Sequence, residues 1–244
     1  MAFFLPKLPV GERTYRRGQV EWALWKFSTL DSPDGDEPLS AFRARVKHLL
    51  QLDRSGRNMG LPWDPPPVEF ALSSFEPRGT GVDALFTAFD AFCLAIALDL
   101  LRGGFKQSEV ALLLRHLRPR LEAPFAHILT SPPAFTSRLV KSVGPQSAQR
   151  RQHDDRRVFL VIERVEFSEA FPVFADMRIK RSQESMLGEP TICHGIDALR
   201  DKLDQMDHLF RRAIVLEIAQ MAARISELLE RAPLRRRGRP PHPV

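Results

Sequence analysis

The chain is poor in cysteine. Only Cys93 and Cys193 occur in 244 residues, and they lie far apart in the sequence. A disulfide framework needs more cysteines, and a zinc site needs closely spaced Cys and His pairs. We therefore expect reduced thiols in a cytoplasmic protein with no metal ion and no other cofactor.

Long apolar segments are absent as well. The longest candidate, 85–101, is interrupted by Asp90 and Asp99. An acid near the centre of a bilayer costs about 2.5–3.5 kcal/mol, and the segment is short for a membrane span. The first ten residues lack the small-residue cleavage site of a signal peptide. The sequence thus predicts no membrane partner and reads 85–101 as a buried helix.

Motifs of catalysis are missing too. There is no glycine-rich phosphate loop, no Gly-x-Ser-x-Gly turn and no paired-cysteine motif. Acidic and histidine residues at 153–155 and 201–208 fit solvated charge better than a metal site. We expect a protein that is not an enzyme, and an enzyme ranks third among the functions considered.

What the chain does have is basic charge, concentrated at its C-terminal end. Lys and Arg total 36 against 30 acids, giving a net charge of +6. The segment 231–244 is too poor in apolar residues to form a core and is predicted to be disordered. The residues predicted to bind DNA there are Arg235, Arg236, Arg237, Gly238 and Arg239.

Within this tail, Arg237-Gly238-Arg239-Pro240 resembles the core of an AT-hook. In that motif the glycine lets the backbone lie low in the minor groove, and arginines follow its narrow A·T-rich floor. The resemblance implies a minor-groove contact with double-stranded DNA, with a log–log salt slope of roughly −4. The alternative is a solubilising tail with non-specific electrostatics.

Two helices are expected near the N-terminus, at 18–27 and 40–54. The second has an apolar stripe at Phe42, Val46, Leu49 and Leu50. Arg43 and Lys47 lie off that stripe and give the helix a basic face, together with Arg54. Arg16 and Arg17 precede the first helix. Residues 1–57 are therefore predicted to form a helix-turn-helix-like block that binds DNA through Arg16, Arg17, Arg43 and Lys47.

The middle of the chain divides at proline-rich stretches. A Pro-rich connection is expected at 58–81, followed by a helical core at 82–130. In that core, one helix starts at Asp83, a second runs from Ser108 to just before Pro119, and a third covers 120–129. A linker is predicted at 131–157. A small β element at 158–195 would pair strand 158–167 with strand 171–179.

The segment 196–230 shows a heptad pattern with a stutter near 210–218. The pattern predicts one long helix whose seam buries itself in a homodimeric coiled coil. The alternative is an amphipathic helix folded back on its own domain. The predicted dimerisation residues are Leu199, Leu203, Met206, Phe210, Ile214, Ile218, Met221, Ile225 and Leu228.

The opening Tyr15-Arg16-Arg17-Gly18-Gln19-Val20, the helix around 43–50 and the segment 101–114 with its Gly-Phe turn resemble MerR-type winged helix-turn-helix regulators. The resemblance implies a dimeric transcription regulator with N-terminal DNA-binding units and a C-terminal coiled coil. The recognition-helix arginine and paired tyrosines of that family have no match here, and a Pro-rich insertion separates the matching segments.

A second possible reader is the helix pair around Gly103-Gly104, with Lys106, Gln107, Arg115 and Arg118 as its exposed polar set. An ordinary helical core explains the same segment equally well. The expected fold is mainly α, with a helix-turn-helix-like N-terminal half, a small β hairpin and a long C-terminal coiled-coil helix. The expected function is DNA binding in transcription regulation, and the alternative is a dimeric adaptor or scaffold.

Overall fold

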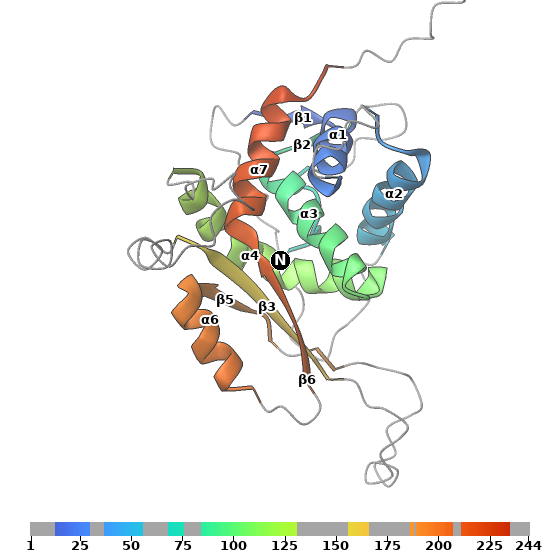
Figure 1. Ribbon diagram of the computed structural model, residues 1–244. Coiled ribbons are helices and arrows are strands. Elements are labelled where there is room, and N and C mark those ends of the chain that lie inside the picture. The colour runs from blue at the N-terminus through green and yellow to red at the C-terminus, as the bar shows by residue number, and fades with distance from the viewer. Residues whose placement is uncertain are drawn as a thin grey trace, which may run out of the picture. The chain divides into compact units, whose positions relative to one another are not determined.

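The computed structural model describes residues 13–29, 37–55, 68–75, 84–130, 156–165, 186–187, 189–206 and 211–234 (Figure 1). The described part is mainly helical with small antiparallel sheets. It forms two compact units: residues 1–123 with 224–244 make unit 1, and residues 124–223 make unit 2. The predicted tail contacts at 235–239, most of the 58–81 connection and of the 131–157 linker, and strand 171–179 lie outside the described residues.

Unit 1 is built around a buried helix, α3 (Ala88–Arg102). It also contains β1 (Tyr15–Arg16), α1 (Arg17–Ser28), α2 (Ser40–Ser55) and β2 (Leu85–Phe86). β1 and β2 pair antiparallel, with Tyr15 opposite Phe86. The helices predicted at 18–27 and 40–54 are confirmed. On α2, the apolar stripe is buried at Val46, Leu49 and Leu50, so the period of 3.6 residues located the core face correctly.

α3 begins later than the sequence predicted. Its N-cap is Thr87, not Asp83. The Thr87 hydroxyl accepts a hydrogen bond from the Asp90 backbone N–H at 3.0 Å, and the Asp90 carboxylate accepts one from the Thr87 N–H at 2.8 Å. This reciprocal pair satisfies two backbone donors at the helix start, whereas residues 85–86 are taken by strand β2.

Helix α4 (Gln107–Thr130) is longer than predicted because it continues through Pro119 and Pro124. The expected break before Pro119 is wrong. A proline inside a helix costs about 3 kcal/mol through a lost hydrogen bond and a steric clash. Here the buried stripe continues past Pro119 from Leu117 to Leu121, while Pro119 itself is exposed. Burial of that stripe outweighs the local cost of the proline.

Unit 2 contains a small antiparallel sheet covered by one helix. Its strands are β3 (Val158–Val165), β4 (Met186–Leu187), β5 (Thr191–His194) and β6 (Arg211–Glu217), and its helix is α6 (Gly195–Asp204). β3 is central and pairs with all three other strands. The strand predicted at 158–167 is confirmed. Phe159, Val161, Cys193 and Leu199 form the core beneath α6.

The continuous helix predicted at 196–230 is wrong. α6 ends at Asp204, β6 follows at 211–217, and α7 (Ile218–Arg231) completes the segment. The predicted seam is thereby divided. Leu199, Leu203 and Met206 lie on or just after α6, Ile214 lies in β6, Phe210 lies outside the described residues, and Ile218, Met221, Ile225 and Leu228 lie on α7.

The physical reason lies in the run Ala213-Ile214-Val215-Leu216. Contiguous apolar residues that include β-branched side chains favour a strand over a helix, and β6 pairs with β3 over its whole length. No continuous seam remains to support a coiled coil.

Both thiols are shielded by this fold. Cys93 is 0% exposed, and burial raises its pKa to about 12. Cys193 is 4% exposed, and burial raises its pKa as well. Because the thiolate is the reactive form, we expect a disulfide reagent to modify the native chain at least about a hundredfold more slowly than the urea-unfolded chain. Stopped-flow absorbance measures both rates, and a fast native phase of one thiol equivalent would contradict the burial.

The described residues contain no helix with both the length and the hydropathy that crossing a bilayer requires.

Candidate nucleic-acid interface

Helix α2 has the strongest basic face in unit 1. Arg45, Lys47 and His48 are exposed, and Arg43 and Arg54 are half-buried at its margins. The only acidic residue of α2 is Asp53, which is 2% exposed. The outward face of α2 therefore carries positive charge with no acid of its own helix to neutralise it.

The basic residues lie on two flanks of that face. With 3.6 residues per turn, Arg43, Lys47 and Arg54 fall on one flank of the helix, and Arg45 falls on the other. From Arg43 to Arg54 the helix rises about 16 Å at 1.5 Å per residue. Small Ala44 lies between the flanks, so an extended polyanion can approach the backbone closely there.

The structure separates the predicted DNA-binding residues by their partners. Arg16 is exposed just before α1, and its backbone N–H, not its guanidinium, donates to the Gln19 side chain at 3.0 Å. Arg17 pairs with Glu21 at 2.6 Å, and Arg43 pairs with Glu37 at 3.2 Å. Lys47 forms no ion pair with another described residue. Lys47 is thus the most available of the four predicted residues that the structure describes.

Arg45 is a further candidate that the sequence reasoning passed over. It is exposed and, like Lys47, forms no ion pair within the described part of the chain. A signal for it was present, because Arg45 directly precedes Val46 at the centre of the apolar stripe. A neighbour one position away is turned by about 100° and so lies on the flank rather than in the core.

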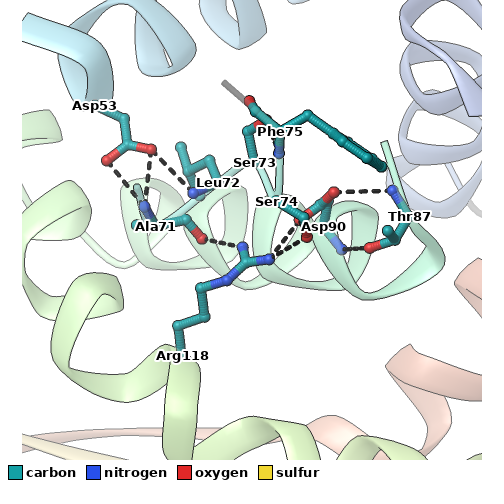
Figure 2. A network of polar contacts seen from close by, with 9 residues as sticks. All are labelled: Asp53, Ala71, Leu72, Ser73, Ser74, Phe75, Thr87, Asp90 and Arg118. Atoms are coloured by element: carbon teal, nitrogen blue, oxygen red, sulfur yellow. Dashed lines mark hydrogen bonds and ion pairs between the residues drawn. The ribbon is translucent and has the colours of Figure 1, made fainter. Parts of the chain in front are cut away.

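Asp53, on the inner side of α2, fixes how the helix is turned about its own axis. Its carboxylate accepts hydrogen bonds from the backbone N–H of Ala71 at 2.9 Å and of Leu72 at 2.9 Å (Figure 2). It also accepts one from Arg115 Nε of α4 at 3.1 Å, and Arg115 donates to the Asp53 carbonyl oxygen as well. With Asp53 held inward, Arg45 and Lys47 are held at the surface.

A second buried ion pair lies beside the first. Arg118 of α4 donates to the Ala71 carbonyl at 2.8 Å, to the Ser74 hydroxyl at 2.6 Å and to the Asp90 carboxylate at 2.6 Å (Figure 2). Its guanidinium also lies 5.0 Å from the centre of the Phe89 ring. Asp90 is 0% exposed and at the same time caps α3. Segment 68–75 is thus tied to α2, α3 and α4 together.

This buried network supports α2 from within and takes no part in its exposed basic face. It balances two arginines against two carboxylates, and all four residues are buried. The sequence also suggested that the helix pair around Gly103-Gly104 binds DNA through exposed Arg115 and Arg118. That expectation is wrong, because Arg115 is 3% and Arg118 6% exposed. Only Lys106 and Gln107 of that set keep access to solvent.

The packing of α1 against α2 differs from a standard helix-turn-helix in its connection. Trp25 of α1 meets Phe42 of α2 edge to face, with ring centres 5.3 Å apart. However, α1 ends at Ser28 and α2 begins at Ser40. The usual connection in the motif is a turn of three or four residues.

The C-terminal end of α7 is fastened to the N-terminal strand. The Tyr15 hydroxyl donates to the Glu230 carboxylate at 2.6 Å, and Arg13 pairs with the same carboxylate. The Gln19 side chain donates to the Ala232 carbonyl at 3.3 Å. We call Arg13, Tyr15 and Glu230 the terminal clasp. It fixes the start of the basic tail, because Leu234 follows two residues after Ala232.

Because of the terminal clasp, we expect the free energy of unfolding to depend on pH. Burial and the hydrogen bond to Glu230 raise the pKa of Tyr15 to about 12. Below pH 10 the phenol is protonated in both folded and unfolded chains, and its stabilising contribution is fully present. Between pH 10 and 12 the unfolded phenol ionises first, so that contribution is lost. We expect Tyr15→Phe to lower the free energy of unfolding by about 1.5 kcal/mol at pH 7.

Urea unfolding of wild type and Tyr15→Phe at pH 7, 9 and 11 measures this effect. The difference between the two proteins should shrink toward pH 11, since the other titrating groups are common to both. A difference that stays constant with pH would show that the phenol proton does not contribute.

Among the described residues, no three His, Cys, Asp or Glu side chains gather as ligands of one metal ion. Comparison with known proteins found no matching family model, no matching curated protein and no matching solved structure.

Proposed function

We propose that this protein binds double-stranded DNA as a transcription regulator, with α2 as the helix that reads the major groove. The observation that supports this best is the exposed basic face of α2, whose one acid is turned inward and neutralised by Arg115. A helix with that charge distribution suits a polyanion far better than an acidic or apolar partner.

The dimensions of α2 agree with this role. The major groove is about 12 Å wide and admits one α-helix. In that position, basic residues on both flanks of the helix face the two phosphate backbones that border the groove. Arg45 contacts one backbone, while Lys47 and Arg54 contact the other, and polar His48 and Gln51 between them face the base edges. Phosphate contacts set the position, and base contacts set the sequence preference.

The tail acts as an accessory contact in this proposal. Its AT-hook-like segment, Arg237-Gly238-Arg239-Pro240, enters an A·T-rich minor groove near the site of α2. The terminal clasp supports this, because it gives the tail a fixed starting point on unit 1 at Leu234. Two weak contacts joined in one chain raise the effective concentration of each at the other.

Fluorescence anisotropy with a labelled duplex tests the proposal. We expect Arg45→Ala combined with Lys47→Ala to weaken binding at least tenfold and to reduce the salt slope by roughly two. The matched control is Arg200→Ala, which removes another exposed arginine, on α6 of unit 2. A chain ending at Pro233 should lose preference for A·T-rich duplex and keep binding. If the double variant binds as tightly as wild type, α2 is not the reader.

The second candidate function is a protein adaptor with a passive tail. The exposed apolar edge of β6, described below, favours it. If neither the full chain nor the chain ending at Pro233 binds duplex DNA, the adaptor becomes the better explanation.

A further inference from the structure

One edge of the sheet in unit 2 has the character of a strand that pairs with another chain. β6 flanks β3 on one side, and β4 and β5 flank it on the other. Within the described ranges, β6 pairs with β3 and with no other strand. The opposite edge is formed by strands of two and four residues, whereas β6 has seven. A long edge strand presents a row of N–H and C=O groups to which a further strand can bond.

The four central residues of β6 do not discourage such pairing, and its charged residues lie at the two ends of the strand. Residues 213–216 are Ala, Ile, Val and Leu, without a charge, a proline or a glycine among them. Val215 is 38% exposed, whereas Leu160 and Val161 on the neighbouring strand are fully buried. Edge strands usually carry a lysine, a proline or a bulge that prevents association. β6 thus leaves apolar surface uncovered on both sides of the sheet's edge.

We propose that β6 pairs antiparallel with β6 of a second copy of this chain, in a register centred on Ile214. The sequence Arg211-Arg212-Ala213-Ile214-Val215-Leu216-Glu217 is complementary to itself in this direction. Ile214 lies opposite Ile214 of the second copy, and Ala213 lies opposite its Val215. At each end, position 211, an arginine, lies opposite Glu217 of the other copy.

Charge selects this register over its neighbours. Residues directly opposite each other share a face of the sheet, so a symmetric pair must be centred on a residue. Centring on Ala213 sets Arg211 against Val215, and centring on Val215 sets Glu217 against Ala213. Only the Ile214 centre matches opposite charges at both ends. Burial raises the pKa of Glu217, whose carboxylate accepts the Ala219 and Gln220 N–H groups at the start of α7, so a facing cation relieves an unfavourable charge.

This inference is independent of DNA binding, and cysteine cross-linking tests its register. Residues directly opposite across an antiparallel pair have Cα atoms about 4.5–5.5 Å apart, which suits a disulfide. With copper–phenanthroline as oxidant, we expect Ile214→Cys to cross-link at least tenfold faster than Val215→Cys, although Val215 is the more exposed. The native thiols are buried and do not compete. Equal rates for the two variants, or no cross-linking by Ile214→Cys, would overturn the register.

Sedimentation equilibrium of the full chain tests the association itself. We expect a monomer–dimer equilibrium whose Kd rises at least tenfold in Ile214→Lys, because two lysines then face each other at the centre. Ile196→Lys is the matched control: Ile196 is 37% exposed on α6 in the same unit, and its replacement should leave the Kd unchanged. Circular dichroism establishes that both variants are folded. A wild-type chain that stays monomeric up to 100 µM, or that associates equally well as Ile214→Lys, would refute the proposal.

Discussion

Replacing Arg118 with methionine is expected to lower the free energy of unfolding by about 3–5 kcal/mol. The substitution keeps much of the apolar stem but removes the cation that faces Asp90. Asp90 is 0% exposed, so its carboxylate is left buried without a facing cation, with only the Ser74 hydroxyl and the Thr87 N–H as donors. The Ala71 carbonyl and the Ser74 hydroxyl lose a donor as well. Urea unfolding followed by circular dichroism measures the loss.

Arg102→Met is the matched control for this prediction. Arg102 also pairs with an aspartate, Asp99, at 2.9 Å, but its side chain is 48% exposed. Exposed pairs of this kind contribute about 0–1 kcal/mol. The contrast between the two variants isolates the effect of burial. If Arg118→Met lowered the free energy of unfolding no more than Arg102→Met does, the buried network would not be holding segment 68–75 in place.

Asp53→Ala is expected to lower the free energy of unfolding by a similar amount, about 3–5 kcal/mol. We also expect it to weaken DNA binding. It leaves Arg115 as a buried cation and removes the acceptor of the Ala71 and Leu72 N–H groups. Because Asp53 sets the rotation of α2, we also expect weaker DNA binding in the folded variant. The expected loss is at least tenfold at a temperature where the protein is still more than 90% folded.

Gln51→Ala is the control for stability alone, since Gln51 lies on the exposed face of the same helix and is itself proposed to face the base edges. It should change stability by less than about 0.5 kcal/mol. Asp53→Asn separates charge from hydrogen bonding, because the amide still accepts a hydrogen bond but cannot neutralise Arg115. DNA affinity in Asp53→Ala equal to wild type at equal folded fraction would uncouple the buried anchor from the interface.

The sequence was sufficient to locate helices whose apolar residues follow one period. The stripe Val46, Leu49 and Leu50 placed α2 and its basic face correctly. From the sequence, Asp90 was only an interruption of the apolar run 85–101, although a buried acid in such a run needs a partner. The sequence could not name the partner, because Arg118 lies 28 residues along the chain and the Asp53–Arg115 pair spans 62. Such pairings depend on tertiary packing, which local patterns do not encode.

The wrong helix at 196–230 has an instructive cause. Phe210, Ile214 and Ile218 are spaced by four, and residues four apart share a face both in a helix and in a strand. The seam therefore contained no information on secondary structure at this point. The stutter in the heptads and the contiguous run Ile214-Val215-Leu216 were the signals that favoured a strand. Weighing contiguity above seam spacing would have predicted β6.

Pro119 shows the opposite error, in which a local rule was trusted too far. A proline ends most helices, yet α4 keeps its buried stripe on both sides of it. The exposed basic face of α2, the candidate interface, was likewise only partly predictable. Lys47 followed from the pattern, but the engagement of Arg17 by Glu21 and of Arg43 by Glu37 required the structure.

The terminal clasp also determines the order in which the chain can mature during synthesis. Tyr15 and Glu230 are separated by 215 positions in the chain. Because synthesis proceeds from the N-terminal side, Tyr15 and Gln19 leave the ribosome before their acceptors on residues 224–232, and the intervening unit 2 can fold first. A chain released before position 224 lacks the Glu230 carboxylate and the Ala232 carbonyl, so the Tyr15 hydroxyl and the Gln19 amide lose these acceptors. The clasp therefore closes only after residues 224–232 have been made, and an open clasp marks a chain from which that segment is missing.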